Sequence, residues 1–495
     1  MASTLSSGAG TPPVPLTDEQ IQSFLANGYL NLQLSLPSAV NEEIYWGTDH
    51  VFRSFQKDFN PHNNIMPMVP GLWQVHDDPV LRGAAQSLLG DDYLVHPHRH
   101  CHTNFPKRGA ATPAMLQGFH KDGHAMRPRP RHREPRWLIM FYYPQDTPGH
   151  RGPTAVMPGS HLLPFLLGDQ ERGDDIVPLT MASDGLLAPA DYHQRRVEML
   201  TAPAGTATLC HFDIGHGASV NGSAVPRYAH KFVLMRTRHP DAAGDGSSVV
   251  DDPVIRHLWR WLGHETPHAP CEFDDWQRGL AAEVARERVD AIYRSGEVTD
   301  AGVVDVLLED VAAHFHRFEE DPVLRVADAV NGLALLDDKQ PILDLMAADT
   351  PAAVGNGCFA AGQAGLASAV ETLARHVAHD HPGVRRQAMT ALGLIGSEHA
   401  EAAPAIIDCL ASVVRDNESW DERLFAVQGL IRLGTDDQTV DVLAPAAHDR
   451  DAYVSAFAIE QLCRIDSDKA RRAVLEPLRR QRWWTDNRYV QMNRQ

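Results

Sequence analysis

A histidine and an aspartate stand two residues apart in the segment Gln117-Gly-Phe-His120-Lys-Asp122-Gly-His124. Side chains at positions i and i+2 of a β-strand point to the same face, so His120 and Asp122 can direct an imidazole and a carboxylate to one point in space. With one distant histidine they would complete a 2-His-1-carboxylate facial triad, which leaves positions on a ferrous ion open for a chelating substrate and oxygen. In a chain with 27 histidines the pair is a weak signal by itself, because most such pairs lie on a surface.

A second motif supplies the distant histidine. The segment His211-Phe-Asp-Ile-Gly-His216 begins about ninety residues after Asp122, and Asn221 and Arg227 stand five and eleven positions after His216. Residues an odd number of positions apart point to opposite faces of a strand, so only one of His211 and His216 can bind the ion. The strand pattern alone leaves the choice between these two histidines open.

Taken together, these segments resemble the phytanoyl-CoA dioxygenase family of iron(II)/2-oxoglutarate oxygenases. That family carries His-x-Asp, then a Gly-Pro-x-x-Val-x-Pro-Gly-Ser-His turn, then a histidine followed by Asn at +5 and Arg at +11. The middle element is matched by Gly152-Pro-Thr-Ala-Val-Met-Pro-Gly-Ser-His161, and Leu16-Thr-Asp-Glu-Gln-Ile is similar to the family's N-terminal helix. The resemblance covers about residues 16–238 and implies a double-stranded β-helix, the jelly-roll or cupin-like fold.

The resemblance also implies the site. It makes His120, Asp122 and His216 the iron ligands, with Fe(II), 2-oxoglutarate and O2 as the cofactors. Arg227 becomes the partner of the distal carboxylate of 2-oxoglutarate, which suits a guanidinium fork better than an ammonium. Asn104 matches an asparagine that touches the cosubstrate in the family. Many members place a hydroxyl two residues after the distal histidine, where this chain has Ala218, so we expect that contact from Ser219.

Other polar residues near the motifs are candidates for contact with substrate: His102, Gln117, His124 and Arg127. We interpret the alternating run from His96 to His102 as one polar strand face, in preference to a metal relay. The basic segment 127–136 either clamps an anionic substrate or forms a solvated loop, and the sequence leaves both interpretations open. His230 stands three residues after Arg227, where a structural role is expected.

The resemblance implies hydroxylation of an unactivated C–H bond in a small-molecule metabolite, with release of succinate and CO2. In one interpretation the metabolite belongs to secondary metabolism. Related halogenases have the carboxylate position vacated, so Asp122 argues against halogenation. Desaturation, epoxidation and cyclisation use the same triad and stay open. The alternative from another class is an interaction scaffold, in which the oxygenase fold is degenerate and the C-terminal part binds a protein.

The elements that must position these residues change in type near residue 240. Before it, short β-rich runs separated by turns predict strands, fronted by N-terminal helices, in a sandwich or barrel. The expected strands are 93–105, 114–120, 137–143, 154–157, 205–212 and 227–237. After a Gly/Ser/Asp-rich linker at 241–248, apolar residues at three- and four-residue spacing predict helices at 253–262, 273–293 and 301–318.

A repeat begins at about residue 320. Arg385-Arg-Gln-Ala-Met-Thr-Ala-Leu392 recurs as Arg423-Leu-Phe-Ala-Val-Gln-Gly-Leu430, with small residues at fixed positions. The period of about 30 to 38 residues resembles the HEAT-like repeats of α-solenoids, with an irregular helical bundle as the alternative. The predicted division is a tail at 1–15, an oxygenase domain at 16–240, connecting helices at 241–319, HEAT-like repeats at 320–482 and a tail at 483–495.

Composition limits the partners. A net charge of −19 argues against nucleic acid, and no apolar run reaches the roughly 20 residues of a membrane helix. The six cysteines include no CxxC pair, which is typical of reduced thiols in a cytoplasmic protein. We therefore expect a small-molecule substrate, with the repeats available for a protein or carrier partner or for self-association.

Overall fold

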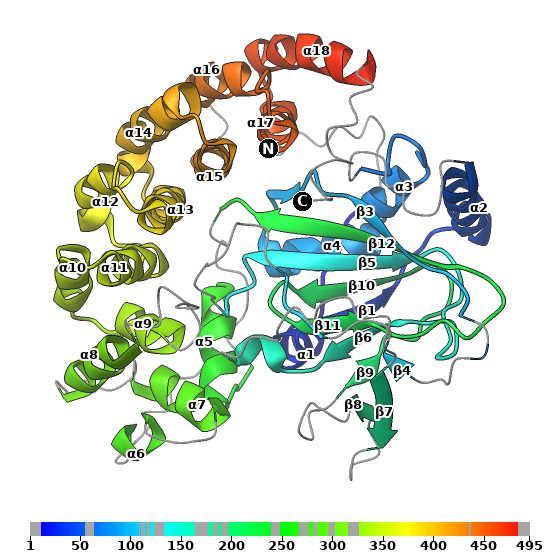
Figure 1. Ribbon diagram of the computed structural model, residues 1–495, viewed down its shortest axis with the longest axis horizontal. Coiled ribbons are helices and arrows are strands. Elements are labelled where there is room, and N and C mark those ends of the chain that lie inside the picture. Colours follow the sequence, from blue (N-terminus) through cyan, green and yellow to red (C-terminus); the bar gives the residue numbers. More distant parts are fainter. Residues whose placement is uncertain are drawn as a thin grey trace.

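The computed structural model consists of an N-terminal part built on antiparallel sheets and a C-terminal part built from helices, arranged as an arc beside the sheets (Figure 1). It describes residues 11–54, 64–107, 109, 114–115, 119–122, 133–163, 177–181, 187–189, 197–238, 248–266, 276–280, 285–295, 302–314, 326–434 and 437–483. The sheets end with β12 at Arg236 and the next helix, α5, begins at Pro253, while most of the expected linker at 241–248 lies outside the described residues.

The main sheet has the strand order β1-β10-β5-β12-β2, and β3 also pairs with β12. Its strands are β1 (Tyr29–Gln33), β2 (Tyr93–Val95), β3 (His100–Asn104), β5 (Trp137–Tyr143), β10 (Thr206–His211) and β12 (Arg227–Arg236). All pairings are antiparallel. Every residue of β5 and β12 is buried, because both faces of these central strands are covered.

Two smaller sheets complete the β-rich part. One joins β11 (Gly215–Ala218), β6 (Thr154–Met157) and β9 (Glu198–Met199), and the other joins β4 (Ala114–Met115), β7 (Val177–Met181) and β8 (Leu187–Pro189). Isolated bridges from Met115 to Ser219 and from His120 to His216 tie the segment around residues 114–120 to β11. This segment therefore lies beside β11, as the site requires.

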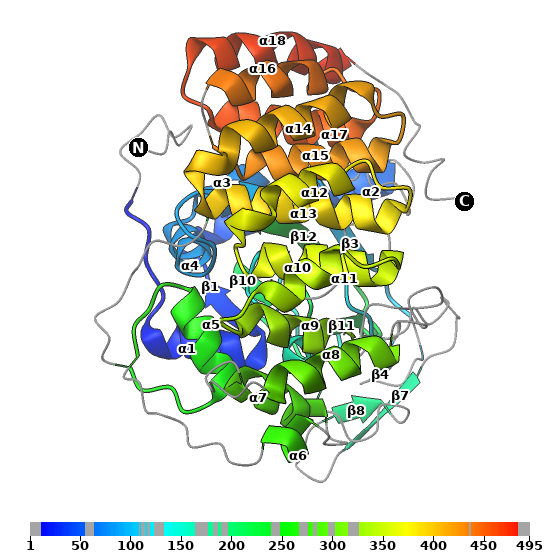
Figure 2. The ribbon, with the colours of Figure 1, turned by 90° about the vertical axis from the view of Figure 1, so that its left-hand side faces the viewer.

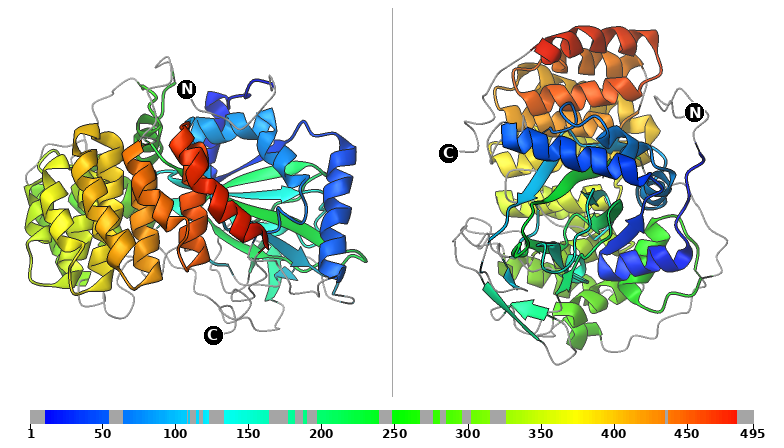
Figure 3. Two further views of the ribbon diagram at one scale, coloured as in Figure 1. Left: turned by 90° about the horizontal axis from the view of Figure 1, so that it is seen from above. Right: turned by 90° about the vertical axis from the view of Figure 1, so that its right-hand side faces the viewer.

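N-terminal helices cover the main sheet on the side away from the arc (Figure 3). They are α1 (Asp18–Asn27), α2 (Ser38–Ser54), α3 (Leu72–Asp77) and α4 (Pro79–Leu89). A capping box at Thr17 and Gln20 starts α1, as the sequence Thr17-Asp-Glu-Gln predicts, and Gly28 ends it at φ 79°. Gly28 then accepts a hydrogen bond from the amide of His211 through its carbonyl, which ties α1 to the end of β10.

Connecting helices follow the sheets along the chain and lead into the lower end of the arc (Figure 1): α5 (Pro253–Trp261), α6 (Trp276–Leu280), α7 (Ala285–Ser295) and α8 (Gly302–His314). Helices α6 and α7 fall within the range of the predicted helix at 273–293, and residues 281–284 lie outside the described residues. Helix α5 packs against both α1 and α7, and Trp259 on it is buried. Among the described residues, no helix is long and apolar enough to cross a membrane.

The arc is a double layer of helices (Figure 2). Consecutive helices form antiparallel pairs, in which α11, α13, α15 and α17 contact one another on the inner side while α12, α14, α16 and α18 do so on the outer side. The helices are α9 (Val326–Leu335), α10 (Gln340–Met346), α11 (Pro351–Gln363), α12 (Val370–His376), α13 (Pro382–Glu398), α14 (Ala403–Asp416), α15 (Trp420–Ile431), α16 (Asp437–Ala446), α17 (Ala452–Arg464) and α18 (Asp468–Trp483). A Cβ atom on Gly393 would come within 2.7 Å of the Cα of Gly429, so α13 and α15 approach closely where each helix contributes one glycine.

The inner side of the arc contacts the main sheet directly. Phe457 packs edge-on against His96, with ring centroids 4.5 Å apart, and the hydroxyl of Tyr453 lies 3.0 Å from Nδ1 of His98. Arg99 forms an ion pair with Glu460. The histidine run is therefore in large part a contact surface for α17.

The prediction of one continuous strand at 93–105 is wrong. The chain leaves the sheet after Val95 and returns at His100, because Pro97 has no backbone N–H to donate to a strand ladder. His96 and His98 consequently turn to α17, while His100 and His102 lie on β3, so the four histidines do not share a single strand face.

Candidate metal centre

A β-bridge brings the first and third predicted ligands together. The amide of His120 donates to the carbonyl of His216 at 2.9 Å, and the amide of His216 donates to the carbonyl of His120 at 3.0 Å. Residues that exchange both hydrogen bonds lie directly opposite each other, and the two imidazole centroids are 4.4 Å apart. The contact therefore depends on backbone pairing between two segments almost a hundred residues apart.

Asp122 adds the carboxylate. Its Oδ1 lies 3.6 Å from Nε2 of His120 and 3.9 Å from Nε2 of His216. One ligand atom from each of the three residues falls within 4.8 Å of the other two. Two imidazole nitrogens and one carboxylate oxygen on one side of a common point make the donor set of a facial triad.

The protonation state of His216 suits a ligand. Its Nδ1 lies 3.2 Å from the carbonyl oxygen of Ile214, so Nδ1 carries the proton and Nε2 carries the lone pair. Burial lowers the pKa of His216 to about 3, which keeps the ring neutral. Nε2 is buried and has no hydrogen-bond partner, a costly state that a metal ion would relieve. The residues present therefore fit a metal ion.

Lys231 is a site residue that the sequence analysis missed. Its ammonium group contacts Oδ2 of Asp122, which leaves Oδ1 facing the two imidazoles. Burial alone would raise the pKa of Asp122, but Lys231, His216 and His120 together hold that pKa well below its usual range. A signal was present in the sequence: Lys231 stands four residues after Arg227, on the same face of β12 and in an otherwise mostly apolar strand.

Arg227 is buried at the start of β12, where it pairs with Asn104 of β3. Its Nε donates to the carbonyl of Gly152 at 2.8 Å and its Nη1 to the carbonyl of His102 at 3.2 Å. No carboxylate in the described part of the chain forms an ion pair with it. Burial lowers the pKa of Arg227, as expected for a cation whose partners are neutral. Such a cation fits an incoming carboxylate.

Asn104 and Ser219 hold the turn at Gly152 and Pro153. The side-chain amide of Asn104 donates to the carbonyls of Ser219 at 2.7 Å and of Gly152 at 3.2 Å. The hydroxyl of Ser219 donates to the carbonyl of Pro153 at 2.5 Å. Gly152 has φ 69°, and a Cβ there would come within 2.3 Å of Nδ2 of Asn104. Both predicted cosubstrate residues therefore shape the turn that also binds Arg227, and Oδ1 of Asn104 remains buried without a hydrogen-bond partner.

Of the four predicted substrate residues, only His102 lies in the described part of the chain; Gln117, His124 and Arg127 lie outside it. His102 is opposite Ala229 on β12, and its ring lies 6.2 Å from that of Phe141. Burial, followed by the charge of Lys231, lowers the pKa of His102 well below its ordinary value. The ring of His216 is 5.8 Å from the same Phe141, so His102 lies on the side of the sheet that faces the triad.

The competing histidines have other partners. Nε2 of His211 lies 3.0 Å from the carbonyl of Arg133, and its ring lies 4.8 Å from that of His161. Nε2 of His230 lies 3.1 Å from the hydroxyl of Thr48. Neither belongs to the His-Asp-His cluster.

Comparison with known proteins places the site within a family domain. Residues 24–229 match the model of the family described as phytanoyl-CoA dioxygenase (PhyH), a segment that contains all three triad residues and Arg227. The comparison with curated proteins gives no match.

Solved structures similar to this chain include three whose TM-scores lie between 0.32 and 0.34. The alpha ketoglutarate dependent carbocyclase SnoK from nogalamycin biosynthesis is 20% identical, with a TM-score of 0.34 over 47% of this chain and 88% of that chain. The epimerase SnoN, in complex with Fe3+, alpha ketoglutarate and nogalamycin RO, is 17% identical, with a TM-score of 0.32 over 45% and 84%. EctD from S. alaskensis, with 2-oxoglutarate and 5-hydroxyectoine, is 17% identical, with a TM-score of 0.33 over 53% and 89%.

Residues 24–229 thus match the phytanoyl-CoA dioxygenase family, and the three converging side chains within them can bind a metal ion. Fe(II), 2-oxoglutarate and O2, the cofactors expected from the sequence, agree with the family domain and with the donor set.

Proposed function

We propose that this protein is an iron(II)- and 2-oxoglutarate-dependent dioxygenase that hydroxylates an unactivated C–H bond of a small-molecule metabolite. One atom of O2 would enter succinate, formed with CO2 from 2-oxoglutarate, and the other would enter the product as a hydroxyl group. The observation that carries the proposal is the convergence of His120, Asp122 and His216, with a buried Nε2 on His216 that no hydrogen bond satisfies.

The three ligands have distinct tasks. Nε2 of His120, Nε2 of His216 and Oδ1 of Asp122 would hold the iron, which with 2-oxoglutarate supplies the activation of O2 when both are bound. The carbonyl of Ile214 fixes the tautomer of His216. Lys231 holds Oδ2 of Asp122, and this contact keeps the carboxylate ionised and turned toward the imidazoles.

Arg227 would bind the far carboxylate of 2-oxoglutarate. Its Nε and Nη1 are fixed by two backbone carbonyls, so the orientation of the guanidinium is set before the cosubstrate arrives. Ionic attraction is strong where water is excluded, and Arg227 is only 2% exposed. Phe141 supplies an apolar wall between His216 and His102, which would keep water from the reacting C–H bond.

Desaturation, epoxidation and cyclisation remain alternative outcomes, because they need the same ligands and the same place for 2-oxoglutarate. The four reactions differ in the substrate carbon that is presented and in the step after hydrogen abstraction. Mass analysis of the product separates hydroxylation from desaturation, because hydroxylation adds one oxygen atom whereas desaturation removes two hydrogen atoms.

The proposal includes the division of the chain into domains and the type of fold of each. We assign residues 16–240 to a double-stranded β-helix, 241–319 to connecting helices and 320–482 to HEAT-like repeats, with tails at 1–15 and 483–495. The close approach of α13 and α15 at these two glycines and the two-layered packing favour stacked repeats over an irregular bundle. The buried thiols of Cys101, Cys210 and Cys358 fit a cytoplasmic location.

The second candidate is a scaffold that binds a protein or carrier through the helical arc. It is favoured by the size of the arc and opposed by the intact donor set. A scaffold with a degenerate site needs neither an unsatisfied imidazole nitrogen nor a buried arginine without a carboxylate partner.

Conversion of 2-oxoglutarate to succinate tests the proposal. The full chain, reconstituted with Fe(II) in the presence of O2, should form succinate slowly without substrate and faster with a metabolite that fits. His216→Ala should abolish the reaction, whereas His211→Ala, a histidine of the same segment outside the cluster, should retain it. Absence of succinate from the folded, iron-loaded protein across a broad metabolite screen would favour the scaffold.

A further inference from the structure

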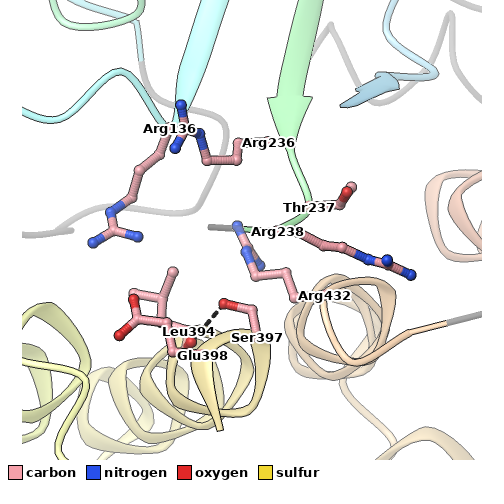
Figure 4. A pocket seen from close by; sticks show the side chains of 8 residues that line it. All are labelled: Arg136, Arg236, Thr237, Arg238, Leu394, Ser397, Glu398 and Arg432. Carbon is pink, nitrogen blue, oxygen red and sulfur yellow. Dashed lines mark hydrogen bonds between the residues drawn. The ribbon is translucent and has the colours of Figure 1, made fainter. Parts of the chain in front are cut away.

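A second polar site lies where the main sheet meets the helical arc (Figure 4). The adjoining ends of β5 and β12 form one wall, and helices α13 and α15 form the other. They border a small hollow, half open to solvent, that is lined by Arg136, Arg236, Thr237, Arg238, Leu394, Ser397, Glu398 and Arg432. Arg236 is nine residues along β12 from Arg227, or roughly 30 Å at about 3.3 Å per residue, so this hollow is separate from the metal centre.

Two of these arginines are held against each other. The amide of Arg236 donates to the carbonyl of Arg136 at 2.9 Å, and both guanidinium groups lie over the ring of Trp261, at 4.1 Å and 5.0 Å from its centroid. Arg236 is 4% exposed and Arg136 is 6% exposed. Like charges repel strongly where water is excluded, and the indole face offsets only part of that repulsion.

The third buried arginine comes from the opposite wall. Arg432 ends the inner helix α15, is 7% exposed, and lies with its guanidinium over Trp137 at 6.0 Å. Burial, followed by the charge of Arg136, lowers the pKa of Arg432 to about 10. Burial and Arg136 also hold the pKa of Arg236 well below its ordinary value. Three guanidinium groups from two parts of the chain thus share one poorly solvated space.

Their hydrogen-bond partners are all neutral. Arg136 donates through Nη2 to Oε1 of Gln363 at 3.1 Å, Arg236 through Nη2 to the carbonyl of Leu88 at 2.6 Å, and Arg432 through Nη1 to the carbonyl of Gln428 at 2.9 Å. Nε of Arg136 and both Nε and Nη1 of Arg236 are buried and have no hydrogen-bond partner. Three unsatisfied cationic donors in one place have a cost that an anion would remove.

The nearby carboxylates do not neutralise this cluster. Glu398 lines the hollow but is exposed, and Glu134 faces His257 at 3.2 Å. Both act on Arg136 at longer range, and among the described residues neither forms an ion pair with a buried arginine of the hollow. Arg238, at the exposed rim, lies 3.5 Å from Asp92, so the charge that remains in the interior is positive.

We propose that this hollow binds a phosphate group, which bridges the main sheet and the helical arc. Guanidinium groups line it from two walls, and such planar forks suit a tetrahedral oxyanion with several acceptor oxygens better than a single carboxylate. The hydroxyls of Thr237 and Ser397 line the same space; they donate to the carbonyls of Asp92 and Leu394 and would exchange these partners for the anion. The group is either inorganic phosphate or the terminal phosphate of a monoester, since both present the same oxygens.

Calorimetric titration of the full chain with inorganic phosphate, at constant ionic strength against chloride, tests the proposal. We expect saturable binding of one phosphate per chain. Arg236→Gln on the sheet wall and Arg432→Gln on the helix wall should each weaken it by about tenfold or more, since each removes a charge-assisted donor. Arg375→Gln is the matched control, because Arg375 is exposed on α12 and paired with Glu371.

Thermal unfolding gives a second readout. Phosphate should raise the Tm of the wild type and of the Arg375→Gln variant, and have little effect on the two pocket variants. A parallel titration with glycerol phosphate separates the sources: tighter binding of the ester indicates the end of a larger molecule, and tighter binding of the free ion indicates inorganic phosphate. Absence of saturable phosphate binding by the wild type, or unchanged affinity in both folded pocket variants, would overturn the proposal.

Discussion

Replacing Arg227 by glutamine should separate the affinity for 2-oxoglutarate from the affinity for iron. The side chain is 2% exposed, and its described partners are the carbonyls of Gly152 and His102, so its charge has no carboxylate partner in the described chain. Loss of a buried, charge-assisted contact costs about 2–5 kcal/mol. At about 1.4 kcal/mol per decade, the dissociation constant for 2-oxoglutarate should rise by about 30-fold to a few thousand-fold.

The same substitution has a structural cost that must be measured separately. Glutamine cannot reach both carbonyls in the geometry of the guanidinium fork, so at least one buried acceptor loses its partner, at about 1–3 kcal/mol of unfolding free energy. Thermal unfolding of the apoprotein reports this term. The cosubstrate term comes from anaerobic titration of the iron-loaded protein with 2-oxoglutarate, followed by the visible charge-transfer band.

Arg151→Gln is the matched control. Arg151 lies on the adjacent turn, where it donates to the carbonyls of Asp146 and Pro226, and it is part of neither the triad nor the Arg227 contacts. We expect the affinity of the Arg151→Gln variant for 2-oxoglutarate to remain within about threefold of the wild-type affinity, because the change lies outside the binding contacts. A folded Arg227→Gln protein that binds iron and 2-oxoglutarate as tightly as the wild type would refute the assignment.

Three further predictions concern the surroundings of the site. Lys231→Met should weaken Fe(II) binding by about 10–100-fold with the fold retained, because Oδ2 of Asp122 loses the ammonium group that orients it. An unchanged affinity for Fe(II) in a metal titration would contradict this positioning role. Burial lowers the pKa of His230 to about 3, so the unfolded chain binds the extra proton and stability falls as pH drops from about 6.5 toward 3. His230→Gln should reduce that slope by up to about 1.4 kcal/mol per pH unit in urea unfolding of the apoprotein, and an unchanged slope would exclude His230 as a source. Truncation after residue 240 should expose the surface around His96 and Trp137 that packs against α17, and the fragment should therefore aggregate or be weakly active. A soluble, monomeric and fully active fragment would show instead that the helical part is an independent module.

Local sequence patterns were sufficient to predict several elements of the β-rich part. The strands predicted at 137–143 and 154–157 coincide with β5 and β6, because unbroken apolar and β-branched runs end at turn residues. Helix α1 begins at its predicted capping box. Strand spacing predicted that His120 and Asp122 share a face, whereas the choice of His216 as the third ligand depended on the family resemblance.

Features that depend on tertiary pairing were not predictable in this way. Pro97 divides the expected strand at 93–105, and the direction in which His96 and His98 then turn is set by α17, more than 350 residues later in the chain. Lys231 could be placed on a strand face but not beside Asp122, since that contact needs the bridge between His120 and His216. The arginine cluster likewise forms only when α15 meets the end of β12.

The most direct test of the central claim is anaerobic binding of Fe(II) to the full chain, measured by equilibrium dialysis with quantification of bound iron. We predict one iron per chain in the wild type and in His211→Ala, and loss of specific binding in His120→Ala, Asp122→Ala and His216→Ala, with circular dichroism unchanged in all of them. Iron bound equally well by folded triad variants, or no iron bound by the wild type, would contradict the assignment of His120, Asp122 and His216 as the metal centre.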